Sequence, residues 1–201
     1  NQWHLLHSVY KSAVANPPSI GYNKPIAKIH VQKEYIMWYA ILGAVLLAGD
    51  QILKYWVVTH LAVGESAPFL PGFMQLTRLH NYGAAWSSFS GRTVLLVVFT
   101  AVLLAAVALL LIKKVVRHWT GITACTLILS GGIGNIIDRI VHGYVVDMFD
   151  LQLFSYPVFN LEDCCVVAGA ILGGVYYLFL YEKYDKKKKE PDHAHDPSDP
   201  S

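Results

Sequence analysis

The chain has 201 residues, of which 54% are hydrophobic and only 15% are charged. This composition excludes a water-soluble globule of ordinary make-up, and a net charge of +2 gives no support to nucleic-acid binding. The Lys and Arg residues collect near the chain ends and in one loop, while the apolar middle carries few charges. We therefore expect a single membrane domain that interacts with lipid.

Residues 1–34 form a polar segment before the first long apolar run, and they include Pro17 and Pro18. They lack the short apolar core and the small-residue cleavage site of a secretory signal peptide. We expect a cytoplasmic tail that is partly disordered or lies on the membrane surface, with no part in the chemistry.

Four segments are apolar and long enough to cross a hydrocarbon core of roughly 30 Å, which takes about 20 helical residues. The first is apolar except for Asp50 and Lys54. Cys125, Cys164 and Cys165 lie inside these segments and imply no disulfide framework. The predicted spans are Tyr35 to about Leu61, Thr93 to Ile112, Trp119 to Ile137, and Cys164 to Tyr181.

The basic residues predict the orientation, because Lys and Arg in short loops stay on the cytoplasmic side. Twelve of the 16 lie before the first span, between the second and third, or after the fourth. We therefore expect both termini in the cytoplasm and residues 62–91 and 139–161 outside. The membrane domain is expected to cover residues 35–185, followed by a basic, disordered tail at 186–201.

The first outward segment has turn residues around a stretch in which apolar and polar side chains alternate. This pattern predicts a small, strand-rich cap lying on the membrane. The residues concerned are Pro68, Pro71, Gly72 and Gly83 for the turns, and Phe73, Gln75, Thr77 and Leu79 for the alternation.

Polar side chains at membrane depth are costly and usually face a partner or a cavity, so each is a functional candidate. Asp147 follows the third span and Asp163 begins the fourth, so both lie at the outward face and can meet. Two carboxyl groups in a poorly solvated pocket tend to share one proton. The candidates are Asp50, Gln51, Lys54, Asn81, Asn135, Asp138, Arg139, Asp147, Asn160 and Asp163.

Such a pair has the chemistry of an aspartic protease. The ionised carboxylate takes a proton from water as the water attacks a peptide carbonyl, and the neutral one donates to the developing oxyanion. Simpler roles stay open for the same residues. An Asp at a helix N-terminus, as at Asp163, is more often a cap. Asp138 and Arg139 are more simply read as structural, satisfied by other polar groups.

Asp50 and Lys54 are four residues apart and can form an ion pair within one helix. Gly131, Gly132 and Gly134 predict close helix packing. His80 and His142 are isolated, so we expect no metal and no other cofactor. A serine nucleophile has no support, because no His and Asp stand at a recognisable spacing from Ser87, Ser88 or Ser130.

Four blocks of sequence, and the order in which they occur, resemble the bacterial lipoprotein signal peptidase (signal peptidase II) family. The resemblance covers about residues 35 to 185, and the combination of blocks is highly specific. The blocks are DQILK (Asp50 to Lys54), NYGAAW (Asn81 to Trp86), GGIGNIIDRIVHGYVVDMF (Gly131 to Phe149) and FNLED (Phe159 to Asp163).

The resemblance implies an all-α membrane protein with four transmembrane helices and a small strand-containing extracytoplasmic cradle. It implies an inner-membrane aspartic endopeptidase that cleaves prolipoproteins on the N-terminal side of their diacylglyceryl cysteine. The implied partners are these signal peptides and membrane lipid, and we expect a monomer.

The resemblance also implies residue roles. Asp147 and Asp163 match the catalytic aspartates, and Asp138 matches a residue that holds the structure. Residues implied to bind or position the substrate and catalytic groups are Asp50, Lys54, Asn81, Gly83, Asn135, Arg139 and Asn160. Two positions depart from the family pattern: Trp86 stands where Phe is common, and Glu162 stands where many members have a small residue. Glu162 adds a third acid beside the pair.

Two rival functions predict other features. A small transporter or channel would spread polar residues through the bilayer depth and show an internal repeat. The featureless second span and the unlike halves of the chain count against it. An accessory scaffold would tolerate Asp147→Asn and Asp163→Asn without loss of function.

Overall fold

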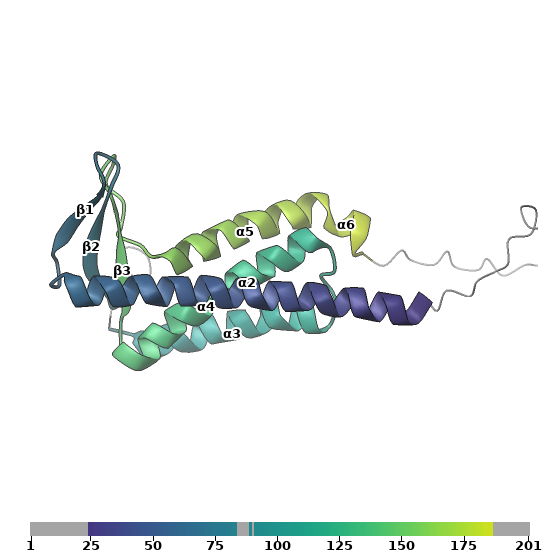
Figure 1. Cartoon of the computed structure of the whole chain (residues 1–201). Coiled ribbons are helices and arrows are strands. Elements are labelled where there is room, and N and C mark those ends of the chain that lie inside the picture. Colours follow the sequence, from purple (N-terminus) through teal and green to yellow (C-terminus); the bar gives the residue numbers. More distant parts are fainter. Residues whose placement is uncertain (1–23, 84–88, 90, 187–201) are drawn as a thin grey trace, which may run out of the picture. The chain divides into compact units, whose positions relative to one another are not determined.

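The structure, a computed structural model, describes residues 24–83, 89 and 91–186 (Figure 1). The expectations for residues 1–23, for Trp86, Ser87 and Ser88, and for the tail after Lys186 lie outside the described residues. The chain divides into two units at Met37 and Trp38. The described part of the first unit is helical, and the second unit contains the sheet, the other helices and every candidate polar residue.

In the part of the chain that the structure describes, four long helices are apolar and long enough to cross a membrane, which confirms the predicted number of spans. A short helix, α6, covers Tyr181–Tyr184. The long helices are α2 (Lys24–His60), α3 (Thr93–Ile112), α4 (Trp119–His142) and α5 (Leu161–Phe179), and the membrane-compatible part of α2 is Ile36–His60.

The helices extend past the predicted limits where charged residues interrupt the apolar pattern. α2 begins at Lys24, although its membrane-compatible part, Ile36–His60, agrees with the span predicted from Tyr35 to about Leu61, and α5 begins at Leu161 instead of Cys164. α4 continues past Ile137 to His142, and it is followed by Gly143, whose φ of 82° suits a glycine at a helix C-terminus. In α4 and α5 the helix continues through Asp138 and Glu162, whose carboxyl groups are paired with Lys54, so these polar residues belong to the helices.

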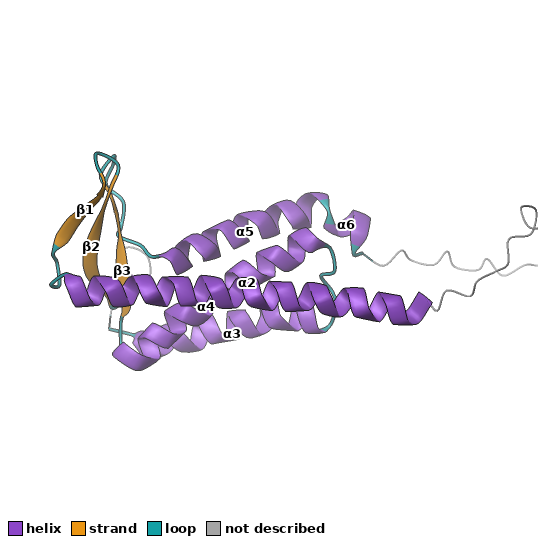
Figure 2. Cartoon of the chain, in the orientation of Figure 1, coloured by secondary structure: helices purple, strands orange, loops and turns teal. Residues whose placement is uncertain are grey.

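A three-stranded antiparallel sheet lies at one end of α3, α4 and α5 (Figure 2). Its strands are β1 (Ser66–Leu70), β2 (Met74–Asn81) and β3 (Val145–Leu151), in that order. The strand-containing cap is therefore confirmed, and β2 contains most of the alternating stretch. β3, which follows α4, was not predicted as a strand; its register sets Leu79 opposite Asp147 and Asn81 opposite Val145.

α4 is the most enclosed of the four spanning helices, and its glycines allow close contact with both neighbours. A Cβ on Gly132 would lie 2.6 Å from Leu104 of α3, and one on Gly131 would lie 2.3 Å from the backbone oxygen of Glu162 in α5. The predicted close packing is present. α3, in contrast, buries only Leu104 within the protein and leaves a largely apolar surface that suits lipid.

At the end of the bundle away from the sheet, Asp185 joins the end of α6 to the α3–α4 connection. Its carboxylate accepts hydrogen bonds from the backbone N–H groups of Arg117 and His118, both at 3.0 Å, and from the Tyr176 hydroxyl at 2.5 Å. The Arg117 guanidinium forms an ion pair with the same carboxylate at 3.3 Å. Asp185 is thus a buried anchor for the C-terminal end of the membrane domain.

Candidate active site

The two predicted catalytic acids come from different elements that meet where the sheet joins the helices. Asp147 is the third residue of β3, and its side chain is 1% exposed. Asp163 lies in the first turn of α5. Since β3 pairs with β2 and α5 packs on α4, side chains from four segments surround the two acids.

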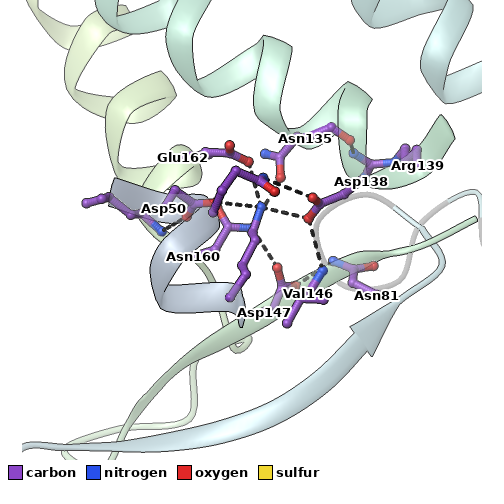
Figure 3. A network of polar contacts seen from close by, with 12 residues as sticks. Asp50, Asn81, Asn135, Asp138, Arg139, Val146, Asp147, Asn160 and Glu162 are labelled. Atoms are coloured by element: carbon purple, nitrogen blue, oxygen red, sulfur yellow. Dashed lines mark hydrogen bonds and ion pairs between the residues drawn. The ribbon is translucent and has the colours of Figure 1, made fainter. Parts of the chain in front are cut away.

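Asp147 is held by two asparagine side chains (Figure 3). Its Oδ2 accepts a hydrogen bond from Asn81 Nδ2 at 2.9 Å, and its Oδ1 accepts one from Asn160 Nδ2 at 2.8 Å. Both donors are neutral amides. They fix the orientation of the carboxyl group without supplying a counter-charge.

Asp163 is held by Asn135 and by the backbone of Asn160. Its Oδ1 accepts from Asn135 Nδ2 at 2.9 Å, and its Oδ2 accepts from the Asn160 backbone N–H at 3.2 Å. In return, Asn160 Oδ1 accepts from the Asp163 backbone N–H at 2.9 Å, which completes a capping box. The capping role considered for Asp163 from the sequence is therefore present.

Asn160 joins the two acids. Its side chain is fully buried, and its Nδ2 donates both to Asp147 and, at 3.2 Å, to Asn135 Oδ1. Asn135 donates in turn to Asp163. A continuous path of hydrogen bonds therefore runs from one carboxyl group to the other through neutral amides, so displacing Asn160 disturbs both.

The electrostatics of this site favour a retained proton. Burial raises the pKa of Asp147, and the negative charge of Asp163 raises it further, to about 7. The hydrogen bonds from Asn81 and Asn160 and the charge of Lys54 act in the opposite direction without cancelling these effects. Near neutral pH, Asp147 can therefore either hold or release a proton, as acid–base catalysis requires.

Arg139 contacts the backbone around the acids. Its guanidinium donates to the carbonyl oxygens of Asn135 at 3.0 Å and Gly83 at 2.8 Å. The Gly83 backbone N–H donates to Asn81 Oδ1 at 2.9 Å. Arg139 thus joins the last turns of α4 to Gly83, which follows β2. The last residue of β2 is Asn81, one of the two amide donors to Asp147.

Behind the acid pair lies a second polar group, the Lys54 cluster, which consists of Lys54, Asp50, Asp138 and Glu162. Lys54 Nζ lies 2.7 Å from an oxygen of each of the three acids, and the four residues are buried. The predicted Asp50–Lys54 ion pair is present, but it is only one of three. The sequence did not reveal that Lys54 also joins α4 and α5.

Asp138 and Asp50 connect the Lys54 cluster to the elements that carry the acid pair. Asp138 accepts from Gln51 Nε2 at 3.1 Å and from the Val146 backbone N–H at 3.3 Å, next to Asp147. Asp50 Oδ1 accepts from the Leu161 backbone N–H at 3.1 Å, two residues before Asp163. Asp138 thus joins the Lys54 cluster to α2 and β3, and Asp50 joins it to α5.

The sequence did not predict two features of the site, which are the strand β3 and the ion pair between Glu162 and Lys54. Gly134 and Glu162 lie in the same predicted polar region, and this was a signal for the buried position of Glu162. Only a glycine at residue 134 leaves room for the Glu162 carboxyl group. His80 and His142 both lie against the Tyr144 ring. Within residues 24–83, 89 and 91–186, no group of three or more His, Cys, Asp or Glu side chains is suited to hold a metal ion.

A family model described as signal peptidase (SPase) II matches residues 42–179, which is more than half of the chain. The chain belongs to the signal peptidase II family. The matched range contains the acid pair, the Lys54 cluster and all four sequence blocks that carry the resemblance. Membership makes the chain a multi-pass membrane protease that processes prolipoproteins.

Similar proteins support this membership over nearly their whole length. The lipoprotein signal peptidase of Enterococcus faecalis is 38% identical over 151 residues, covering 75% of this chain and 93% of that protein. The lipoprotein signal peptidase of Lactococcus lactis subsp. lactis is 37% identical over 149 residues, covering 74% and 95%.

Two solved structures of bacterial membrane enzymes, obtained in meso at 2.3 and 1.9 Å resolution, share the fold of this signal peptidase II family member. Their TM-scores are 0.68 and 0.67, at sequence identities of 30% and 31%. The matches cover 79% and 72% of this chain and 96% and 95% of theirs.

Proposed function

We propose that this signal peptidase II family member is an aspartic endopeptidase in which Asp147 and Asp163 are the catalytic residues. It cleaves lipid-modified prolipoproteins on the N-terminal side of the diacylglyceryl cysteine. The observation that carries the proposal is the path of neutral amides through Asn160 and Asn135 that joins the buried carboxyl group of Asp147 to the partly buried one of Asp163.

The mechanism follows from one proton shared by two acids. The ionised carboxylate takes a proton from a water molecule while the water oxygen attacks the scissile carbonyl carbon, and the neutral carboxyl group protonates the carbonyl oxygen. The tetrahedral intermediate then collapses. Its C–N bond breaks as the leaving nitrogen takes a proton from one carboxyl group, and a hydroxyl proton of the intermediate returns to the other carboxylate. The pair again holds one proton.

The neighbouring residues keep this pair in position. Asn81 and Asn160 orient Asp147, and Asn135 orients Asp163, with neutral donors that leave the shared proton in place. Arg139 fixes the backbone of Gly83 and Asn135 around them. The Lys54 cluster, with Asp50, supports the helix ends behind the acids.

The substrate and the location follow from the membrane setting. We place the protein in the bacterial inner membrane with both termini in the cytoplasm, because basic residues predominate on that side, and we expect a monomer. The sheet end then faces outward, where an acylated cysteine at the membrane surface brings the scissile bond to the acids. Buried acyl chains contribute roughly 0.8 kcal/mol per CH₂ to binding.

The test is a cleavage assay with purified protein in lipid vesicles and a diacylglyceryl-modified prolipoprotein. Asp147→Asn and Asp163→Asn should each lower kcat by about 1,000-fold or more while the protein stays folded in the membrane. Asp150→Asn, on the same strand, is the matched control. Its carboxylate accepts from Gln75 and Thr77 within the sheet, and cleavage should stay within about threefold of the original rate.

Mass spectrometry of the products identifies the bond that is cut, which should lie immediately before the modified cysteine. A precursor without the diacylglyceryl group should be a poor substrate, with kcat/KM lower by about 100-fold or more because its binding energy is lost. Retained proteolysis in both aspartate variants would exclude the acid pair, and equal rates for the two precursors would exclude the lipid requirement.

A further inference from the structure

The charges in the Lys54 cluster do not balance. One ammonium group faces three carboxyl groups, and the side chains of Lys54, Asp50, Asp138 and Glu162 are only 4%, 0%, 2% and 1% exposed. If all three acids were ionised, two negative charges would remain uncompensated where water does not reach. Burial of an unpaired charge is strongly unfavourable, and a buried acid in excess avoids it by keeping a proton.

The hydrogen bonds indicate which acids keep that proton. Both oxygens of Asp138 accept hydrogen bonds, one from Gln51 and one from the Val146 N–H. Asp50 Oδ2 and Glu162 Oε1, in contrast, are buried without a hydrogen-bond partner, although Asp50 Oδ2 is ion-paired with Lys54. The Asp50 and Glu162 carboxyl groups lie on the same ammonium group, since Lys54 Nζ is 2.7 Å from an oxygen of each. Ionised carboxylates only accept hydrogen bonds, so a bond between these two requires a proton on one of them.

We propose that Asp50 and Glu162 share one proton, and that Glu162 acts through this contact as a positioning residue for Asp163. The Lys54 cluster then carries one net negative charge, and both orphaned oxygens belong to one hydrogen-bonded carboxyl pair. The proton needs no oxidant or external group, since it is the one that either acid carries before ionisation.

The geometry of α5 explains how Glu162 positions its neighbour. Two successive residues of the first turn are attached to α2: the Leu161 N–H donates to Asp50 Oδ1 at 3.1 Å, and Glu162 Oε2 accepts from Lys54 at 2.7 Å. On the other side, a Cβ on Gly134 of α4 would lie 1.3 Å from Glu162 Oε1. The Glu162 side chain therefore fills the space between α5 and α4 and fixes the turn that carries Asp163.

The same contact gives the site a second dependence on pH. When the shared proton is lost, a second uncompensated negative charge appears beside Asp163, and the first turn of α5 is held less firmly. The ionisable groups that act on Glu162 are Asp50 and Lys54 from α2, Asp138 and Arg139 from α4, and Cys165 from α5. Asp163 is its neighbour in the chain.

An infrared measurement tests for the proton without any cleavage. Protein in lipid vesicles is compared at pH 8 in the Asp147→Asn background, which removes the titration of Asp147. The carbonyl-stretch band of a protonated carboxyl group should be present in Asp147→Asn and lost in Asp147→Asn/Glu162→Gln. A band of equal size in both proteins, or no band in either, overturns the shared proton.

A cleavage assay tests the positioning role by rescue. Glutamine can accept from Lys54 and donate to Asp50, as a neutral glutamic acid does, whereas alanine can do neither. Glu162→Ala should lower kcat by about tenfold or more with KM changed less than about twofold, because Asp163 is misplaced. Glu162→Gln should restore kcat to within about threefold of the original value.

Wild-type kcat in Glu162→Ala, or a Glu162→Gln variant as slow as Glu162→Ala, overturns the positioning role. Circular dichroism and Tm of both variants show whether the folded fraction is the same. The inference rests on the proposed function only for its effect on cleavage. If Asp147→Asn and Asp163→Asn still cleave, the proposed function is wrong. The infrared measurement on Glu162 does not depend on cleavage and tests the shared proton independently.

Discussion

Asp147 and Asp185 are both buried aspartates outside the spanning helices, and they lie at opposite ends of the four-helix domain. Asp147 receives hydrogen bonds from two neutral amides and lies near another acid, so burial and the charge of Asp163 raise its pKa to about 7. Burial alone also acts to raise the pKa of Asp185. The Tyr176 hydroxyl, the backbone N–H groups of Arg117 and His118 and the Arg117 guanidinium outweigh this effect and lower it.

The difference shows that the donors around a buried carboxyl group, more than its depth, determine what the group can do. Neutral donors together with a second acid leave Asp147 able to gain and lose a proton near neutral pH. A guanidinium, a hydroxyl and two backbone N–H groups keep Asp185 ionised and make it an anchor. Four predictions test the two halves of this comparison, starting with the largest expected effect.

Stability should depend on pH through Asp147. Its pKa of about 7 in the folded protein lies above the usual 3.8, so the folded state retains a proton that the unfolded state releases. This contribution is complete below about pH 4 and is lost as the pH rises through about 7, a loss of about 4 kcal/mol by pH 8.

Thermal unfolding in detergent micelles from pH 4 to pH 8 measures this loss. The fall in Tm over that range should be smaller in Asp147→Asn than in the original protein, while Asp150→Asn should keep the full fall. In the original protein kcat/KM should also decline above about pH 7, as the acid pair loses its proton. An Asp147→Asn curve parallel to the original would contradict the raised pKa.

The second largest effect is expected from removing the Asn160 amide, which joins the two acids. Asn160→Ala deletes one donor to Asp147 and the side-chain half of the capping box with Asp163. We expect kcat to fall by about 100-fold, because both carboxyl groups lose their orientation, and stability to fall by about 1–3 kcal/mol. Steady-state kinetics with the lipid-modified precursor and a Tm measurement provide both values. Full activity in this variant would mean that the path through Asn160 has no part in the reaction.

Substitution of the anchor residue Asp185 should lower stability and leave activity unchanged. Asp185→Asn replaces a charged acceptor that receives hydrogen bonds from four donors, and we expect a loss of about 2 kcal/mol in the free energy of unfolding. The kcat per folded molecule should stay unchanged, because Asp185 lies at the other end of the bundle. A fall in kcat larger than the fall in the folded fraction would show that Asp185 also contributes to the reaction.

The smallest effect is expected from Tyr176→Phe, which removes one hydroxyl donor to Asp185 and keeps the ring. The loss of stability should be about 1 kcal/mol, and activity should be unaltered. Denaturant unfolding of this variant, of Asp185→Asn and of the double variant gives the coupling between the two residues. Additive losses would show that the hydroxyl and the carboxylate act independently.

Local sequence patterns were enough to predict the four spans and the end of the bundle where the polar residues collect. Apolar runs of about 20 residues are a local signal, and so is the alternating pattern that indicated β2. Those signals also brought Asp147 and Asp163 to one depth. They placed helix ends less well, because an apolar pattern stops at Asp138 or Glu162 while the helix continues through them.

The side chains that meet in the site could not be predicted in this way, because they come from segments that are far apart in the chain. Asn81 reaches Asp147 because β2 pairs with β3, and Lys54 reaches Glu162 across 108 positions of sequence. Such contacts depend on packing among distant segments, which no local period encodes. The same packing gave Asp147 neutral partners and Asp185 charged ones, and through them opposite pKa shifts, so identical side chains became a titrating acid and a fixed anchor.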